Sequence, residues 1–385
     1  MNSRLLEVLA SPCCKADLSI KINQFHENMH HANQQKIISG ILTCVKCGKG
    51  YPILDSVPRL CLELMKEEKV ALSILREKNE VIAVPEKMAV SNYTASAQIE
   101  KIVRNKISIP LNASNYLKNR IKNDIFCRIE GCEKQEKYVY TLTAYYKGPF
   151  KHILEIGGGQ GGLAKCLISN LCPDLYVMVD IDLEWIRAAC IRNPNADIIR
   201  GDAVNLPIID ESFDVVISQS MLEHIREYSM ALHEMCRVTR KALFVSWGPN
   251  KYFVYDFGHL DAPITIFPKN IAKNIAIFWH KVCNTRRTKE SIASEINDTF
   301  YISTISVYRL LRNYGRVFNV FTEFCMNSLK SEYSYMYRDL RRLLKNSPFF
   351  SKQIFKLLAF FHIEPQCYYI LIKDYKKGKK LCQNL

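Results

Sequence analysis

Short apolar runs alternate with longer amphipathic stretches between Lys151 and Gly248. The apolar runs predict strands, and the stretches between them, with apolar residues at helical spacing, predict helices. The predicted strands span 152–156, 175–180, 213–218 and 242–246, and the predicted helices span 163–170, 184–191 and 221–238. Such alternation indicates a mostly parallel sheet covered by helices on both faces. We therefore expect a doubly wound, Rossmann-like α/β core.

The segments on either side of this core have a different texture. Two short cysteine-bearing turns, joined by a polar stretch at 21–36, occupy the first 60 residues. The next segment reads mainly as helix, at 62–78 and 119–146, with a loop or mobile lid at 81–114. Two further strand candidates, 316–321 and 366–372, could close the same sheet. These patterns predict four regions: 1–60, 61–147, 148–250 and 251–385.

Composition narrows the class of protein. The chain has 385 residues, 48% hydrophobic and 24% charged, as in soluble globular proteins. It has no run of eighteen apolar residues, and Glu7 interrupts the short apolar stretch at the start, so neither a membrane-spanning helix nor a secretory signal is predicted. The expected compartment is the cytoplasm.

The net charge of +15 is concentrated near the C-terminus. Residues 262–385 contain 21 lysines and arginines against 8 aspartates and glutamates. Such asymmetry suggests an anionic partner, either nucleic acid or an acidic membrane surface, although a solvated basic face explains it equally well.

A glycine-rich segment follows the first predicted core strand. It reads Glu155-Ile-Gly157-Gly-Gly159-Gln-Gly161-Gly162. The carboxyl end of such a strand is where parallel α/β sheets bind ligands. The spacing also satisfies the dinucleotide fingerprint GxGxxG, in which backbone N–H groups meet a pyrophosphate. Two acids favour S-adenosylmethionine instead. Glu155 would be unhelpful beside a pyrophosphate, and Asp180, at the end of the second strand, is placed to accept hydrogen bonds from ribose hydroxyls.

A third segment, Gly201-Asp202-Ala203-Val-Asn-Leu-Pro-Ile-Ile-Asp210-Glu-Ser-Phe-Asp214, completes a pattern that resembles a known family. With the glycine loop and Asp180, it resembles the class I S-adenosylmethionine-dependent methyltransferases of the ubiquinone-biosynthesis or type 11 kind, over about residues 150–248. The resemblance implies a methyltransferase. It places the methionine part of the cofactor beside Gly157, Gly159 and Gly161, the ribose at Asp180, and the adenine at Asp202 and Ala203. Glu155, Ile181 and Ser218 complete the expected cofactor site.

Two histidines are candidates for acceptor chemistry. The segment Ser218-Gln-Ser-Met-Leu-Glu-His224-Ile resembles the family's motif after strand four, beside the transferred methyl. His224 is a candidate general base, because imidazole titrates near physiological pH, or a structural residue at a helix start. His259, in the loop 252–263, is a second candidate, or part of an ordinary loop. Motifs of enzymes that methylate nucleic-acid amines or cytosine C5 are missing here, which leaves a small hydroxyl, amine or activated-carbon acceptor open.

Four cysteines near the N-terminus are grouped: Cys13, Cys14, Cys44 and Cys47. The flanking Lys-Cys47-Gly-Lys-Gly-Tyr-Pro resembles the small zinc-ribbon proteins that act as methyltransferase activators, which implies a zinc-ribbon-like β module. Ser11 stands where that family has its first cysteine. Cys14, Cys44 and Cys47 match, and either Cys13 or one of His26, His30 and His31 could complete a zinc site. The alternative is a ribbon that folds without metal.

A basic and aromatic segment at 337–361 could lie on an anionic membrane, bind single-stranded RNA or simply cover the sheet. Three functions follow as hypotheses. The first is methyl transfer to a small or lipid-linked metabolite; the others are an RNA methyltransferase and a non-catalytic S-adenosylmethionine-binding scaffold or partner subunit. The sequence makes no prediction of the oligomeric state.

Overall fold

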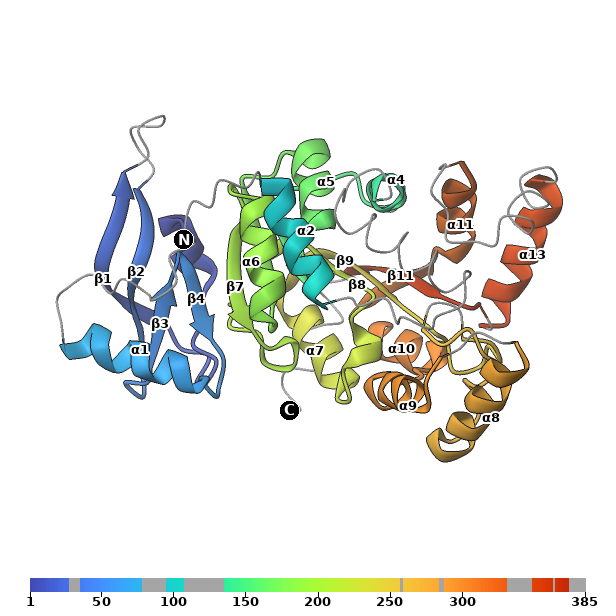
Figure 1. Ribbon diagram of the computed structural model, residues 1–385. Coiled ribbons are helices and arrows are strands. Elements are labelled where there is room, and N and C mark those ends of the chain that lie inside the picture. The colour runs from blue at the N-terminus through green and yellow to red at the C-terminus, as the bar shows by residue number, and fades with distance from the viewer. Residues whose placement is uncertain are drawn as a thin grey trace. The chain divides into compact units, whose positions relative to one another are not determined.

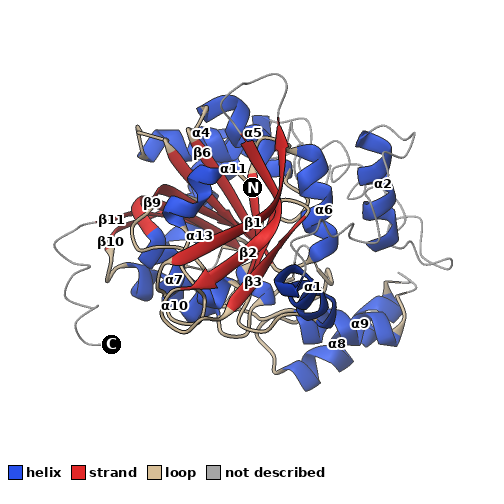
Figure 2. Cartoon of the chain, turned by 90° about the vertical axis from the view of Figure 1, so that its left-hand side faces the viewer, coloured by secondary structure: helices blue, strands red, loops and turns tan. Residues whose placement is uncertain are grey.

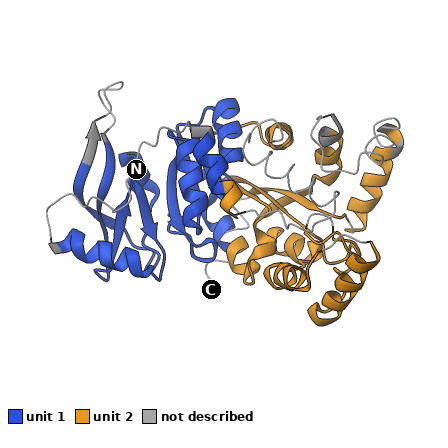
Figure 3. Ribbon diagram, in the orientation of Figure 1, with its two compact units in different colours: residues 1–102, 150–216, 233–240 blue, residues 103–149, 217–232, 241–385 orange. Residues whose placement is uncertain are grey.

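The computed structural model describes residues 1–27, 35–77, 95–106, 135–256, 259–283, 287–330, 348–362 and 364–373. Two compact units make up the chain (Figure 3). Unit 1 comprises residues 1–102, 150–216 and 233–240, and unit 2 comprises residues 103–149, 217–232 and 241–385. Among the described residues, no helix is long and apolar enough to cross a membrane.

The N-terminal part of unit 1 is an antiparallel meander that follows a short 3-10 helix, η1 (Ser3–Val8). Its strands are β1 (Leu18–Glu27), β2 (Gln35–Cys44), β3 (Gly50–Leu54) and β4 (Val57–Leu60). The interpretation of residues 21–36 as a polar connection was therefore wrong for 21–27 and 35–36, which belong to β1 and β2. Leu18, Ile20 and Ile22 alternate with polar residues, which is the pattern of a half-buried strand.

The core part of unit 1 contains three parallel strands, β5 (His152–Ile156), β6 (Leu175–Asp180) and β7 (Asp197–Gly201). Helices α5 (Gly162–Leu171) and α6 (Leu183–Arg192) pack on β6. The strand order is β1-β2-β3-β4-β7-β6-β5-β8 (Figure 1). The last strand of the meander, β4, pairs in parallel with β7, and this pairing connects the meander to the core strands. Strands β5 and β6 confirm the sequence prediction, whereas β7 was missed.

Three of the described helices lie between β4 and β5 in the sequence. Helix α1 (Lys66–Glu77) falls within the predicted helix at 62–78. Helix α2 (Ala95–Lys106) lies in the segment predicted to be a loop or lid, so that prediction was wrong for these residues. The remainder of 81–114 lies outside the described residues. Helix α4 (Glu136–Tyr145) confirms the end of the helix predicted at 119–146, whose residues before 135 are likewise not described.

The strands of unit 2 follow the order β8-β9-β11-β10. Strands β8 (Phe213–Gln219) and β9 (Thr239–Trp247) contain the predicted core strands, and both cross the boundary between the units. Strand β11 (Cys367–Lys373) runs antiparallel to β9 and to β10 (Gly315–Asn319), which confirms the two closing strands.

The predicted helix at 221–238 is interrupted. It forms a short 3-10 helix, η3 (Leu222–His224), and then α7 (Tyr228–Val238), because Ile225 between them is extended. The other helices of this part of the chain are α8 (Lys269–Val282), α9 (Lys289–Asp298), α10 (Thr304–Leu311), α11 (Phe321–Lys330) and α13 (Pro348–Phe360), shown in blue in Figure 2.

Aromatic rings form part of the core of unit 2. Tyr138 of α4 packs edge-on against Phe244 of β9 and Phe324 of α11, with ring centroids 5.4 and 4.8 Å apart. Phe324 in turn stacks on Tyr368 of β11 at 3.8 Å. These contacts hold helices against the closing strands.

Candidate cofactor and acceptor sites

The glycine loop after β5 is attached to the end of β6. The Gly159 N–H donates to Asp180 Oδ2 at 2.8 Å, and the Asp182 N–H donates to Asp180 Oδ1 at 2.9 Å. Gly159 has a φ of +53°, and no atom lies within 4 Å of the place where a Cβ would stand. The loop is thus fixed by Asp180 and open on its outer side, as a site for a bound ligand requires.

A second glycine of this loop is required by packing. Gly161 has a φ of +76°, and an added Cβ would come within 2.3 Å of Asn193 Nδ2. The same Asn193 amide donates to the Gly161 carbonyl at 2.8 Å. Asn193 therefore holds the start of α5, and the sequence analysis did not single it out.

Glu155 is buried beneath the loop, where its carboxylate accepts a hydrogen bond from the Tyr176 hydroxyl at 2.6 Å. Burial raises the pKa of Glu155 to about 8, although the Tyr176 hydrogen bond works in the opposite direction. An added Cβ on Gly158 would lie 3.0 Å from Glu155 Cδ. No motif indicated Tyr176 as the partner of Glu155. The assignment of Glu155 to the cofactor site stays a prediction.

The side chain of Ile181, next to Asp180, is 55% exposed. Its carbonyl accepts a hydrogen bond from Arg200 Nε at 3.2 Å. Arg200 Nη1 lies 2.8 and 3.0 Å from the two carboxylate oxygens of Glu68 in α1. This buried ion pair supports the turn after β6. No local pattern predicts this pair, because Glu68 belongs to a charged stretch that resembles a solvated helix face.

Asp202 caps a short 3-10 helix, η2 (Ala203–Asn205), by accepting a hydrogen bond from the Val204 N–H at 3.0 Å. This is a turn role, and the half-buried carboxylate retains further acceptor sites for the predicted adenine contact. Ala203 is buried beside it.

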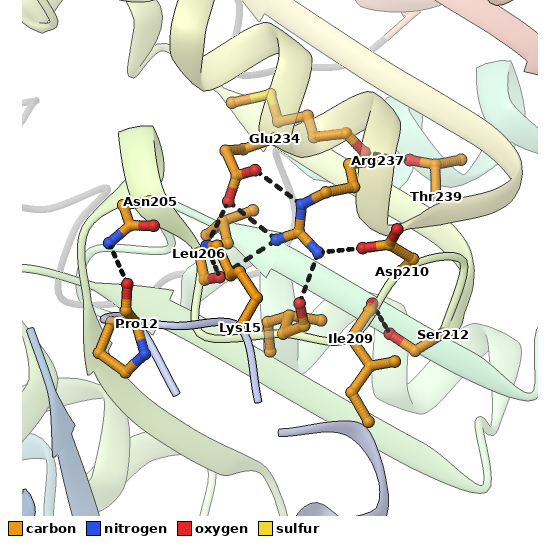
Figure 4. Close-up of polar contacts among 12 residues, drawn as sticks. Pro12, Lys15, Asn205, Leu206, Ile209, Asp210, Ser212, Glu234, Arg237 and Thr239 are labelled. Carbon is orange, nitrogen blue, oxygen red and sulfur yellow. Dashed lines mark hydrogen bonds and ion pairs between the residues drawn. The ribbon is translucent and has the colours of Figure 1, made fainter. Parts of the chain in front are cut away.

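The turn that carries Cys13 and Cys14 contacts the end of η2 and the residue that follows it. Asn205 Nδ2 donates to the Pro12 carbonyl at 2.9 Å, and Lys15 Nζ donates to the Leu206 carbonyl at 2.7 Å. Lys15 also pairs with Glu234 of α7, as Figure 4 shows. The turn and the predicted adenine-side loop are therefore parts of one polar network within unit 1.

The four grouped cysteines converge. The Sγ atoms of Cys13, Cys14, Cys44 and Cys47 all lie within 4.8 Å of one another, and those of Cys13 and Cys47 are 3.3 Å apart. Burial raises the Cys44 pKa, but hydrogen bonds from Ser11 and from the Cys47 and Lys46 N–H groups outweigh it and lower the pKa to about 6. Burial also raises the pKa of Cys13, but its hydrogen bonds outweigh this effect and lower the pKa. Four convergent thiols, two of them predisposed to ionise, fit a tetrahedral zinc ion.

Ser11, which replaces the family's first cysteine, is fully buried and accepts a hydrogen bond from the Ala16 N–H at 3.1 Å. It shapes the turn, and Cys13 joins the cluster. The alternative ligands His30 and His31 lie outside the described residues, as does the side chain of His26.

Unit 2 brings the two candidate histidines together. The rings of His224 and His259 are 5.6 Å apart between centroids and steeply inclined. Glu223 joins them: one oxygen of its carboxylate and one nitrogen of each histidine lie within 4.8 Å of one another. Asp256 Oδ1 lies 3.5 Å from His259 Nδ1. Sequence reasoning missed Glu223 as a member of this group.

The electrostatics of this group follow from burial. Glu223 is 2% exposed, and burial raises its pKa to about 7. Burial lowers the His259 pKa, but the neighbouring carboxylates of Asp256 and Glu223 outweigh it and raise the pKa above its ordinary value. The His224 pKa is lowered, chiefly by desolvation. Ser218, at the end of β8, is fully buried, and its hydroxyl has no hydrogen-bond partner among the described residues.

Two protein-family models match parts of the chain. Residues 154–244 match the family model described as a methyltransferase domain. The chain carries a methyltransferase domain. Residues 2–56 match the model described as Trm112p-like protein, so this domain follows a Trm112p-like segment. The expected fold and the expected class, an S-adenosylmethionine-dependent methyltransferase domain, are thereby confirmed.

Curated proteins that are similar to part of the chain are named as methyltransferases. Phthiotriol/phenolphthiotriol dimycocerosates methyltransferase 1 of Mycobacterium ulcerans is 36% identical over 107 residues, 27% of this chain and 36% of that protein. Fatty-acid O-methyltransferase of Mycolicibacterium smegmatis is 32% identical over 132 residues, 32% of this chain and 45% of that protein. The chain thus spans less than half the length of these relatives.

Solved structures with a similar fold are more distant. Magnesium protoporphyrin IX methyltransferase of Synechocystis PCC 6803 has a TM-score of 0.37 at 12% identity, covering 75% of this chain and all of that chain. The complex of the Haloferax volcanii Trm112 methyltransferase activator with a methyltransferase has a TM-score of 0.36 at 12% identity, covering 63% of this chain and 91% of that chain.

Proposed function

We propose that the protein transfers a methyl group from S-adenosylmethionine to a hydroxyl or carboxylate oxygen of a lipophilic, lipid-linked acceptor, releasing the demethylated cofactor and, from a hydroxyl, a proton. The observation that carries the donor half is the link between the glycine loop and Asp180, which lies inside the segment matched by the methyltransferase family. The acceptor half is supported by the named relatives, which act on a dimycocerosate lipid and on fatty acids.

The residues present fit the donor. Gly157, Gly159 and Gly161 would line the methionine part, since the loop is open at Gly159. Asp180 would accept from the ribose hydroxyls with the lone pairs that its two backbone hydrogen bonds leave free. The exposed Ile181 would pack on the adenine, with Asp202 and Ala203 at its edge and Ser218 nearer the methyl.

The bound cofactor supplies a methyl group already activated by a positive sulfonium. The protein therefore has to hold donor and acceptor in line, which can lower the barrier by on the order of 7–11 kcal/mol. The polar end of the acceptor would lie at the group formed by Glu223, His224 and His259, and Asp256 would orient His259. Lipid chains would then lie outside this polar group.

Titration calorimetry tests the donor half. Wild-type protein should bind S-adenosylmethionine and its demethylated product, and Asp180→Ala should weaken both at least tenfold, because the ribose loses an acceptor and Gly159 loses its partner. Asp174→Ala, which removes an exposed acid just before β6, is the matched control and should bind normally. Failure of folded wild-type protein to bind either compound would disprove the proposal.

The acceptor half is tested with long-chain fatty acids and lipid diols as candidate acceptors, with the methyl group radiolabelled. Incorporation into a lipid extract supports it. Incorporation into RNA would favour the RNA hypothesis, and S-adenosylmethionine binding without transfer to any extract would favour the scaffold hypothesis.

The hypothesis that residues 337–361 lie on an anionic membrane also stays a prediction. Helix α13 exposes Phe349 and Phe360, and residues 337–347 lie outside the described residues.

A further inference from the structure

We infer that Glu223, His224 and His259 form a binding site for one divalent transition-metal ion, separate from the cysteine cluster. All three residues lie in unit 2, and one potential ligand atom from each falls within 4.8 Å of the others. Ligands bound to one ion at about 2.1 Å lie roughly 3–3.5 Å apart, so closing the site requires movements of about 1 Å. Such movements are within the reach of side-chain rotation.

The orientation of the two rings supports this assignment. His224 Nδ1 lies 3.2 Å from the Asp298 carbonyl oxygen, and His259 Nδ1 faces the Asp256 carboxylate at 3.5 Å. The carbonyl keeps the proton of His224 on Nδ1, and the Asp256 carboxylate favours the same tautomer of His259, so Nε2 is the expected ligand atom of each ring. Metal-binding histidines commonly have such a partner on their second nitrogen.

The charge of the group also favours a cation. Glu223 and Asp256 are both almost completely buried, and Glu223 Oε2 has no hydrogen-bond partner among the described residues. A buried, unpaired carboxylate oxygen is costly. A divalent ion held by Glu223 Oε2 would remove that cost, and Asp256 would balance charge from the far side of His259.

Asp256 is a positioning residue for His259 because backbone hydrogen bonds fix its carboxylate beside the imidazole. Its carboxylate accepts hydrogen bonds from the His259 and Leu260 N–H groups at 3.3 Å. These contacts hold Asp256 in place beside the imidazole. Loss of such an outer partner commonly weakens metal binding 10- to 100-fold.

Two imidazoles and one carboxylate suit Zn²⁺, Mn²⁺, Fe²⁺ or Co²⁺, whereas four thiolates select zinc and other soft metals. Three protein ligands leave coordination positions open, and His224 is exposed, so an oxygen ligand can approach from that side. If the proposed function holds, this ligand is the acceptor's hydroxyl or carboxylate. The metal site itself does not depend on that function.

Mn²⁺ is the probe of choice because thiolates bind it poorly. The 385-residue chain, with its cysteine cluster loaded with zinc, is titrated with Mn²⁺ and followed by electron paramagnetic resonance of the free ion. We expect one Mn²⁺ per chain. Glu223→Gln and His259→Gln should weaken binding at least tenfold, and Asp256→Asn 10- to 100-fold. His233→Ala, a histidine of α7 outside the group, should bind Mn²⁺ as the wild type does.

Calorimetry with S-adenosylmethionine on the same samples separates the possible failures. Absence of bound Mn²⁺, or equal affinity in wild type and both ligand variants, would overturn the metal site even if the cofactor binds. Retained Mn²⁺ binding in a wild type that fails to bind the cofactor would overturn the proposed function alone. Circular dichroism of each variant must match the wild type, and the conservative glutamines are chosen to ensure this.

Discussion

Arg200 and Glu68 form a buried ion pair in which Nη1 lies 2.8 Å from Oε2, and the side chains are only 9% and 4% exposed. Arg200 also donates to the Ile181 carbonyl, which places it between α1 and the turn after β6. The helix that follows the Trm112p-like segment is therefore attached to the turn that carries Asp180. Two effects are expected when the pair is broken, one on stability and one on cofactor affinity.

Glu68→Gln should lower the free energy of unfolding by about 3–5 kcal/mol, because it leaves a buried arginine without its counter-charge. It should also weaken S-adenosylmethionine binding severalfold, since the Ile181 turn loses its support. Urea denaturation and calorimetry measure the two effects. Glu67→Gln changes the exposed neighbour and should do neither. Equal behaviour of the two variants would show that the pair does not position the turn.

Arg237 joins four acceptors in the network of Figure 4. It pairs with Glu234 and Asp210, each at 2.6 Å, and donates to the carbonyls of Leu206 and Ile208. Arg237→Ala should cost about 2–4 kcal/mol of stability, because a largely buried carboxylate and two carbonyls lose their donor.

The matched control for this network is Arg187→Ala, which removes an exposed i,i+3 pair with Glu184. Such a pair is worth at most about 0.5 kcal/mol. Thermal and urea unfolding of both variants measure the difference. A cost for Arg237→Ala as small as that of the control would mean that the network does not join the cysteine turn to the core.

Glu155 should make stability depend on pH. Its pKa is about 8 in the folded protein, against an ordinary value of 4.5. Below pH 4.5 both states hold the proton. Between 4.5 and 8 only the unfolded chain releases it, so stability should fall as pH rises through this window and level off above 8. Glu155→Gln keeps an acceptor for Tyr176 and should flatten this dependence in melts from pH 5 to 9. Glu184→Gln, which changes an exposed glutamate, is the control and should keep the wild-type dependence of stability on pH. The same dependence in Glu155→Gln would contradict the raised pKa of Glu155.

The cysteine cluster predicts a zinc-dependent part of the stability. The double variant Cys44→Ser/Cys47→Ser should lose one equivalent of zinc relative to the wild type and should melt at a lower temperature, since metal binding is coupled to folding. Cys283→Ser, which changes an exposed cysteine of unit 2, is the control. In cobalt-loaded protein, a thiolate charge-transfer band should disappear only in the double variant. An identical zinc content in all three proteins would refute the site.

Strands β5 and β6 were predicted at their observed bounds because their apolar runs end at glycine or at an acid, which are local signals. Strand β7 was missed because Asp197-Ile-Ile-Arg-Gly is short and begins and ends with polar residues or glycine. Its burial comes from pairing with β6 and β4, which are far away in the sequence. The hairpin of β1 and β2 was missed because the many polar residues at 21–36 suggested a polar connection, although apolar and polar residues alternate along β1.

The sequence by itself determined the α/β class, the glycine loop, the acid at the end of β6 and the four cysteines, because these depend on local periodicity, on backbone conformations that only glycine adopts readily, and on residue spacing. The tertiary structure decided which distant residues meet. It placed Glu68 against Arg200, Tyr176 against Glu155, and Glu223 near two histidines. Such pairs have no local signature, since burial and electrostatics act only after the chain has folded.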